Sequence, residues 1–153
     1  MRAIQLAGAI DATGRADLDA AVAALLEVAR RYREMGVEPE RPVTLIVEDM
    51  PIMGATESRT AGHRLHVGAH AVGSGMLDGL IAHEMGHMVR TEQGHPSHTA
   101  EVHRRVLRSL EVPPSQRNGF LAVARVAVNH VQDVYADDLA IRVIGRDRIG
   151  PFF

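Results

Sequence analysis

Hydrophobic residues in the first part of the chain recur with two different periods. From residue 17 to residue 35 they return every three or four positions, the period of a helix with one apolar face. This stripe consists of Leu18, Val22, Leu25, Leu26 and Ala29. Gly36 follows it and is a favourable helix stop. Residues 41–50 (RPVTLIVEDM) are instead rich in β-branched residues and bounded by prolines, which predicts a strand.

Shorter segments surround these two elements. Residues 4–7 (IQLA) predict a short first strand, and residues 64–72 (RLHVGAHAV) predict another, which is broken by the glycines at 73 and 75. Between the strands, residues 51–62 (PIMGATESRTAG) have the composition of a loop.

Helical patterns dominate the rest of the chain. A helix is predicted around residues 83–87 (HEMGH), and a second from Ser97 to about Leu110. After a PPSQRNG linker, residues 119–144 predict one long helix. The element order is an N-terminal helix, a short mixed sheet, the HEMGH helix, a further helix and a long C-terminal helix. It predicts an α+β fold, with residues 1–153 as a single domain.

Composition narrows the classes of function. The chain has no cysteine, which excludes disulfides and thiolate metal sites, so a metal must be held by histidine and carboxylate. Its formal net charge of -2 gives no basic surface for nucleic acid. No apolar run reaches the ~20 residues of a membrane helix, and the first ten residues do not resemble a signal peptide. We therefore expect a cytoplasmic protein with neither nucleic-acid nor membrane partners.

HEMGH has the spacing of a catalytic zinc site. On a helix, His83 and His87 lie on one face, so both imidazoles can reach the same metal. Glu84 lies about 100° away around the helix, where it can take a proton from a metal-bound water. Apolar residues precede and follow the motif and would keep such a site dry.

A third ligand must come from elsewhere in the chain. The pattern HExxHxxGxxH is excluded, because this sequence has Arg90 and Gln93 where the pattern needs Gly and His. On the last helix, however, Asp133 and Asp137 lie one turn apart, with His130 one turn before them. By helical projection these three share a stripe with Val126, Ala140, Ile141 and Ile144.

That stripe should face the core. Carboxylates in a core are costly unless a cation or firm hydrogen bonds receive them, and a zinc ion on the motif histidines would be such a cation.

With these two motifs, the chain resembles the gluzincin metallopeptidases, zincins in which HExxH is followed on a later helix by an acidic ligand. Asp133-Val-Tyr-Ala-Asp137 resembles the ExxxD of that family, with Asp in place of Glu at position 133. The shorter aspartate requires a closer approach of the two helices. The size of the chain resembles that of the compact minigluzincins.

The resemblance implies a role for each of these residues. His83, His87 and Asp133 would bind one Zn²⁺ per chain, and Asp137 would hydrogen-bond a ligand histidine. Glu84 would act as the general base in the hydrolysis of a peptide or protein substrate.

Alternatives remain open for two parts of this site. Glu101 rivals Asp133 as third ligand, although a solvated glutamate at a helix N-terminus explains it more simply. Asp137 is a further alternative for the third ligand. His98, His130 and Tyr135 are all candidate hydrogen-bond donors to the oxyanion of the transition state.

Three further histidines, His63, His66 and His70, surround the strand predicted at 64–72. In zincins an edge strand before the motif helix binds substrate backbone. The three histidines would line the cleft there, or less simply bind a second metal.

The C-terminal region suggests two further contacts. The long helix is apolar nearly all round, which favours either a central position or a homodimer contact. Phe152 and Phe153 either dock on the protein's own core or lie in a cleft and restrain activity.

A different class of function keeps the zinc without the enzyme: a non-catalytic, zinc-stabilised interaction or regulatory domain. Glu84 favours the enzyme, since a structural site needs no general base.

Overall fold

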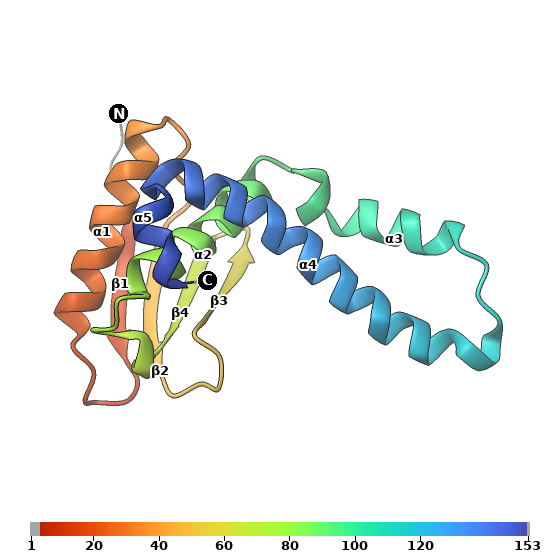
Figure 1. The fold of residues 1–153 in the computed structure, drawn as a ribbon, viewed down its shortest axis with the longest axis horizontal. Helices are drawn as coiled ribbons and strands as arrows, with labels where there is room; N and C mark the ends of the chain where they lie inside the picture. Colours follow the sequence, from red (N-terminus) through yellow and green to blue (C-terminus); the bar gives the residue numbers. More distant parts are fainter. Residues whose placement is uncertain (1–3, 153) are drawn as a thin grey trace.

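A computed structural model describes residues 4–152, and it contains a four-stranded mixed sheet with helices on one face (Figure 1). The strands are β1 (Leu6–Asp11), β2 (Val43–Glu48), β3 (Gly54–Arg59) and β4 (Gly62–Gly68), in the order β1-β2-β4-β3. β1, β2 and β4 are parallel, and β3 is antiparallel to β4. The predicted α+β class is confirmed.

The helices are α1 (Leu18–Glu34), α2 (Leu77–Glu92), α3 (Ala100–Ser109), α4 (Arg117–Ile144) and α5 (Arg146–Ile149). Asp17 caps α1, because its carboxylate accepts a hydrogen bond from the Ala20 N–H. α1 and α2 pack on the sheet, and the C-terminal half of α4 crosses over α2 (Figure 1). The motif helix therefore lies between the sheet and α4. No helix within residues 4–152 combines the length and apolar character needed to cross a bilayer.

The core lies between the sheet and the first two helices. β2 alternates along its length: Val43, Leu45 and Val47 are buried, while the residues between them are half-buried. Such alternation is the pattern of a strand with one face against a core. The hydroxyl of buried Tyr32 on α1 donates a hydrogen bond to the Ala82 carbonyl on α2 at 2.6 Å, which fixes the two helices relative to each other.

A hairpin arm, which we define as residues 100–132, projects from this body (Figure 1). It contains α3 and the N-terminal part of α4, joined by a short 3₁₀ turn, Pro114–Gln116. None of the α3 residues is buried. Ala124 is the one buried residue of α4 within the arm.

The prediction that residues 51–62 form a loop is wrong, because Gly54–Arg59 is strand β3. Apart from Thr56, its residues (GATESR) have little strand propensity of their own, but the strand pairs in register with β4, for example Thr56 with Leu65. Pairing with a neighbour overrides local composition here. The strand predicted at 64–72 is therefore not the edge strand: it runs from Gly62 to Gly68, inside the sheet.

Other boundaries also differ from prediction. The first strand is Leu6–Asp11 rather than 4–7. The helix expected from Ser97 is interrupted: a 3₁₀ turn covers Pro96–His98, and α3 starts only at Ala100. α4 begins two residues before the predicted Gly119.

The core-facing stripe predicted for the last helix is correct only from residue 133 onward. Val126 is 56% exposed, and His130 is exposed as well. Helical projection shows which residues share a face of the helix. It does not show over how many turns other elements pack against that face. Similarly, Leu26 of the predicted α1 stripe is exposed.

Candidate metal centre

The two motif histidines lie one turn apart on α2, on the face turned toward α4. The helix around them is buried on several sides, with Leu80, Ile81, Ala82, Met85 and Met88 all in the core. This packing fixes the helix, so the imidazoles project from a rigid element.

A glycine allows α4 to approach these histidines. If Gly86 carried a Cβ, that atom would lie 2.6 Å from the carbonyl oxygen of Ala136 and 2.9 Å from its Cα. Such distances are shorter than real Cβ contacts, so only glycine fits the crossing. The small side chain of Ala136, itself fully buried, completes the close contact. This closeness is the approach that an aspartate at position 133 requires.

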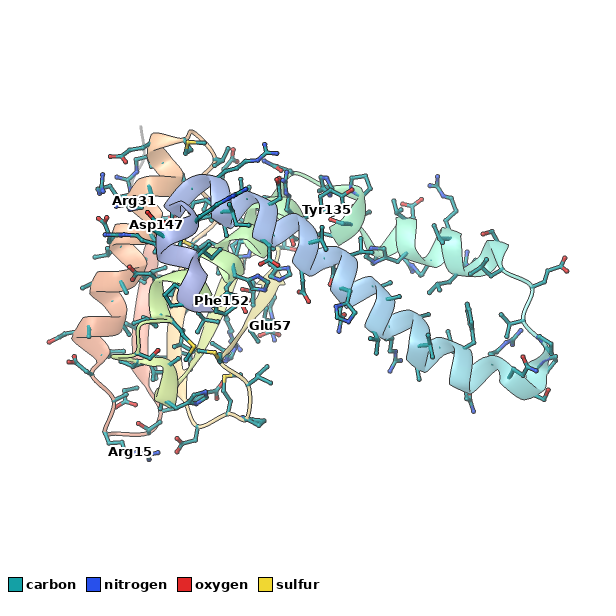
Figure 2. All side chains as sticks on the ribbon, in the orientation of Figure 1. Arg15, Arg31, Glu57, Tyr135, Asp147 and Phe152 are labelled. Atoms are coloured by element: carbon teal, nitrogen blue, oxygen red, sulfur yellow. The ribbon has the colours of Figure 1, made fainter. Side chains whose placement is uncertain are left out.

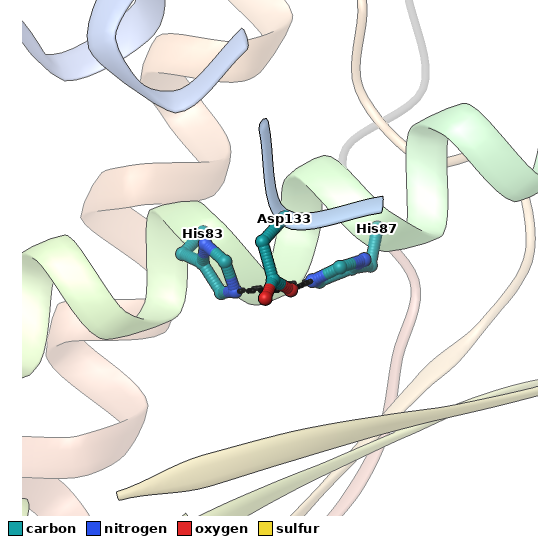
Figure 3. A group of neighbouring side chains, drawn as sticks. All are labelled: His83, His87 and Asp133. Atoms are coloured by element: carbon teal, nitrogen blue, oxygen red, sulfur yellow. Dashed lines mark hydrogen bonds and ion pairs between the residues drawn. The ribbon is translucent and has the colours of Figure 1, made fainter. Parts of the chain in front are cut away.

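Asp133 lies between the two histidines (Figure 3). Its Oδ1 is 3.4 Å from Nε2 of His87 and 3.8 Å from Nε2 of His83, and the two Nε2 atoms are 3.0 Å apart. Within the described residues, these three side chains form the cluster whose ligand atoms converge within 4.8 Å. The cluster could hold a metal ion.

Hydrogen bonds on the far side of each ring orient the lone pairs toward this cluster. Nδ1 of His83 lies 2.6 Å from Asp137 Oδ1, and Nδ1 of His87 lies 2.8 Å from Nε2 of His98. A carboxylate only accepts, so we assign the His83 proton to Nδ1, and the same assignment suits His87. Both Nε2 atoms then present lone pairs to each other and to Asp133. Three acceptors at this separation need a cation, or else a proton between the two imidazoles.

The hydrogen bonds behind His87 continue along the loop after α2. Nδ1 of His98 bonds the Ser97 hydroxyl at 2.8 Å, and that hydroxyl lies 2.7 Å from Nδ1 of His95. Burial lowers the pKa of both His87 and His98 to about 4, and neighbouring histidines contribute to the same shift. Both rings are therefore neutral near pH 7, the state in which imidazole binds metals.

Glu84 is 5% exposed, and its side chain lies between its own helix, α2, and the edge strand β3. Its Oε2 accepts a hydrogen bond from the Thr56 hydroxyl of β3 at 2.8 Å. Burial raises the pKa of this carboxyl and outweighs the Thr56 hydrogen bond, which acts in the opposite direction.

The C-terminal segment docks on the body beside the cluster. The 3₁₀ turn Gly150–Phe152 carries Phe152, which is labelled in Figure 2. The centroid of its ring lies 5.4 Å from that of His83. Gly79, one turn before His83, makes room for it, since a Cβ there would lie 2.5 Å from Phe152 Cβ. The tail thus packs on the protein's own core and also flanks the cluster. Phe153 lies outside the described residues.

The remaining candidate residues lie away from the cluster. Glu101 is on α3, its side chain 73% exposed and paired with Arg105. His130 is exposed on the arm. Tyr135 packs against the His95 ring at 4.5 Å and, two residues from Asp133, lies on another side of α4 (Figure 2). Of the three predicted oxyanion donors, His98 alone is close, and it contacts a ring rather than facing the cluster.

Histidines 63, 66 and 70 do not form a metal-binding cluster within the described residues. His63 is buried between Ser58 and Glu92, each 2.8 Å from one ring nitrogen. His66 bonds Glu48 at 2.6 Å. The side chains of His63 and His66 thus form hydrogen bonds that link β4 to its neighbouring strands and to α2.

Comparison with known proteins places the chain in a family without giving it an activity. Residues 15–153 match a family of unknown function, DUF5781. The chain belongs to this family. No curated protein and no solved structure matches it. For this DUF5781 member, the geometry of the cluster is therefore the main indication of function.

Two contributors to this geometry were missed from sequence. Thr56 lay in a segment interpreted as loop, so its contact with Glu84 could not be anticipated. Gly86 was visible inside HEMGH, and a glycine within a buried helix is a signal of close packing that sequence can provide.

Proposed function

We propose that this protein is a zinc-dependent metallopeptidase of gluzincin type. The observation that carries the proposal is the convergence of three acceptor atoms, from His83, His87 and Asp133, beside a buried glutamate. Tetrahedral zinc with bonds of ~2.0–2.1 Å separates its ligand atoms by roughly 3.3 Å. The separations of 3.0, 3.4 and 3.8 Å between the three atoms bracket that value.

Each residue of the chain has a distinct part in the proposed reaction. His83, His87 and Asp133 would hold the zinc, which would lower the pKa of a water and polarise the scissile carbonyl. Glu84 would take the proton from that water and pass it to the leaving amine. The raised pKa of this buried carboxyl suits a group that must both accept and return a proton. Asp137 and His98 would act as positioning residues, because each fixes the ring of one ligand histidine.

The edge strand β3 supports a peptide as substrate. It pairs with β4 on one side and is the last strand of the described sheet, so its other edge can accept an extended chain. Thr56 ties this strand to Glu84, which places the proposed peptide-binding edge next to the proposed base.

The first experiment measures zinc per chain and hydrolysis of a mixture of quenched fluorescent peptides. We expect about one zinc in the wild type and in Glu84→Gln, with hydrolysis reduced in Glu84→Gln by a factor of about 10²–10⁴. Asp133→Ala should lose the zinc, while Glu101→Ala, the exposed rival, should keep it.

Two results would count against the proposal. Zinc binding with equal, negligible hydrolysis in wild type and Glu84→Gln would favour the non-catalytic, zinc-stabilised domain, in which Glu84 only anchors β3. Absence of zinc even after it is supplied would remove both functions.

A further inference from the structure

The hairpin arm contains an apolar groove that no part of the described chain fills. It is lined by side chains of both α3 and α4, has a volume of about 360 Å³, and includes Val106, Leu110, Phe120, Val123, Val128 and Val131. Several of these are strongly exposed, Val123 at 69% and Val106 at 55%. Apolar faces of this kind mark interaction sites.

The groove is elongated rather than a closed pocket. Two further hollows adjoin it and share Phe120: one is bounded by Val112 and Gly119, the other by Arg108 and Arg117. A surface that runs between two helices suits a third helix laid along it.

Charge identifies the kind of partner. Arg104, Arg108 and Arg117 line one of the adjoining hollows, and none has a carboxylate within ion-pair distance in the described part of the chain. The arm as a whole carries five arginines and two glutamates, while the rest of the chain carries 12 arginines and 17 acidic residues. Two arms packed together would therefore bring like charges together, which opposes a symmetric dimer through this surface.

We propose that the groove of the hairpin arm binds an amphipathic helix of another protein, with its apolar face in the groove and acidic side chains against Arg104, Arg108 and Arg117. The inference is independent of the proposed peptidase activity, since it uses none of the residues of the metal centre.

The test uses a fluorescein-labelled synthetic helix with leucines on one face and glutamates on both flanks. A second probe has lysine in place of each glutamate. Binding is measured by fluorescence anisotropy on the full chain carrying Glu84→Gln, so that any hydrolysis cannot consume the probe. We expect the glutamate probe to bind at least about tenfold more tightly than the lysine probe, with an affinity that falls as salt increases.

Matched variants locate the binding. Arg108→Glu should weaken the binding of the glutamate probe by about tenfold or more. Arg105→Glu, the same change on the same helix at a residue paired with Glu101, should have little effect. Likewise Val131→Glu, in the groove, should weaken binding and Val126→Glu, outside it, should not.

Several results would overturn the proposal. They are no binding of the glutamate probe, equal binding of both probes, equal effects of the two arginine variants, and a wild-type dimer in sedimentation velocity that Val131→Glu converts to monomer. The last would assign the groove to a second copy of this chain. Adsorption to anionic lipid vesicles in place of probe binding would equally replace the helical partner with a membrane surface.

Discussion

The two halves of α4 lie in different surroundings. From Asp133 onward the helix crosses α2 at close range, with Ala136, Leu139, Ala140, Val143 and Ile144 buried. Before that point it faces α3 across a groove, and valines at 123, 126 and 131 are exposed. Both halves are mostly apolar in sequence. The two halves differ in how closely another helix approaches. Within residues 4–152, no helix packs closely on the first half, whereas α2 packs on the second half because Gly86 and Ala136 are small.

Hydrogen exchange along this one helix should reveal the difference most strongly. Amides around residues 136–143 need opening of the body to exchange, whereas those around 121–128 need only local fraying of the arm. We expect protection to differ by on the order of a thousandfold, or ~4 kcal/mol. The comparison within a single helix removes differences between elements. Uniform protection along α4 would mean that the arm is as stable as the body.

Exchange of glycine for alanine should have opposite effects in the two halves. Gly86→Ala forces a Cβ into Ala136, so we expect a loss of about 1–3 kcal/mol in the free energy of unfolding and weaker metal binding. Gly119→Ala on the arm meets no atom within 4 Å, and the higher helix propensity of alanine should stabilise α4 there by up to ~1 kcal/mol. Urea unfolding and zinc titration of both variants measure this. A stable Gly86→Ala that binds zinc normally would show that the crossing can relax.

The hydrogen bond behind His83 should matter for metal affinity. Asp137→Asn keeps the shape but weakens the acceptor for Nδ1 of His83, and loss of such an outer contact typically costs 10–100-fold in affinity. Asp138→Asn is the control, because that carboxylate pairs with two arginines, Arg142 at 2.9 Å and Arg90 at 3.4 Å, rather than with a motif histidine. Competition against a chelator measures both affinities. Equal affinities in the two variants would remove the positioning role of Asp137.

These contrasts also explain what sequence could and could not predict. His83, His87 and Asp133 were found because helical spacing and side-chain chemistry are local properties, and the structure brings these three together. The strand β3 was missed, because its pairing with β4 is not encoded in its own composition. The exposure of Val126 was missed for the same reason, since burial depends on whether another element reaches that turn. The sequence thus predicted the His83, His87 and Asp133 cluster more fully than the surface that lies beyond it.

The C-terminal tail gives a smaller effect. The Phe152 ring flanks His83, so Phe152→Ala, or deletion of residues 150–153, should increase kcat/KM for peptides if the proposed activity is present. We expect an increase of up to about tenfold, equivalent to ~1.4 kcal/mol of steric restraint. The cost in stability should be about 1–2 kcal/mol, because Phe152 is only partly buried. Phe120→Ala, the same change in the arm, should leave kcat/KM unchanged. An unaltered rate in the tail variants would mean that the tail only packs.

The smallest predicted effect is a loss of stability at low pH. It arises from the buried pair of His63 and Glu92, which joins the end of α2 to the sheet. Burial lowers the pKa of His63, despite the hydrogen bond to Glu92. Burial opposes ionisation of Glu92, but hydrogen bonds from the Glu40 N–H, His63 and the Arg41 N–H outweigh it and lower its pKa. In both cases the unfolded chain binds the proton more tightly.

Stability should therefore be greatest above the ordinary pKa of each group and should fall as the pH decreases. For His63 the decline begins near its ordinary value of 6.5, and for Glu92 near 4.5. Urea unfolding of the metal-free protein at a series of pH values measures the slope. His63→Gln should flatten the upper part of the decline and Glu92→Gln the lower part, each relative to wild type in the same buffers. If His63→Gln leaves the slope unchanged, this pair does not link the stability of the body to pH.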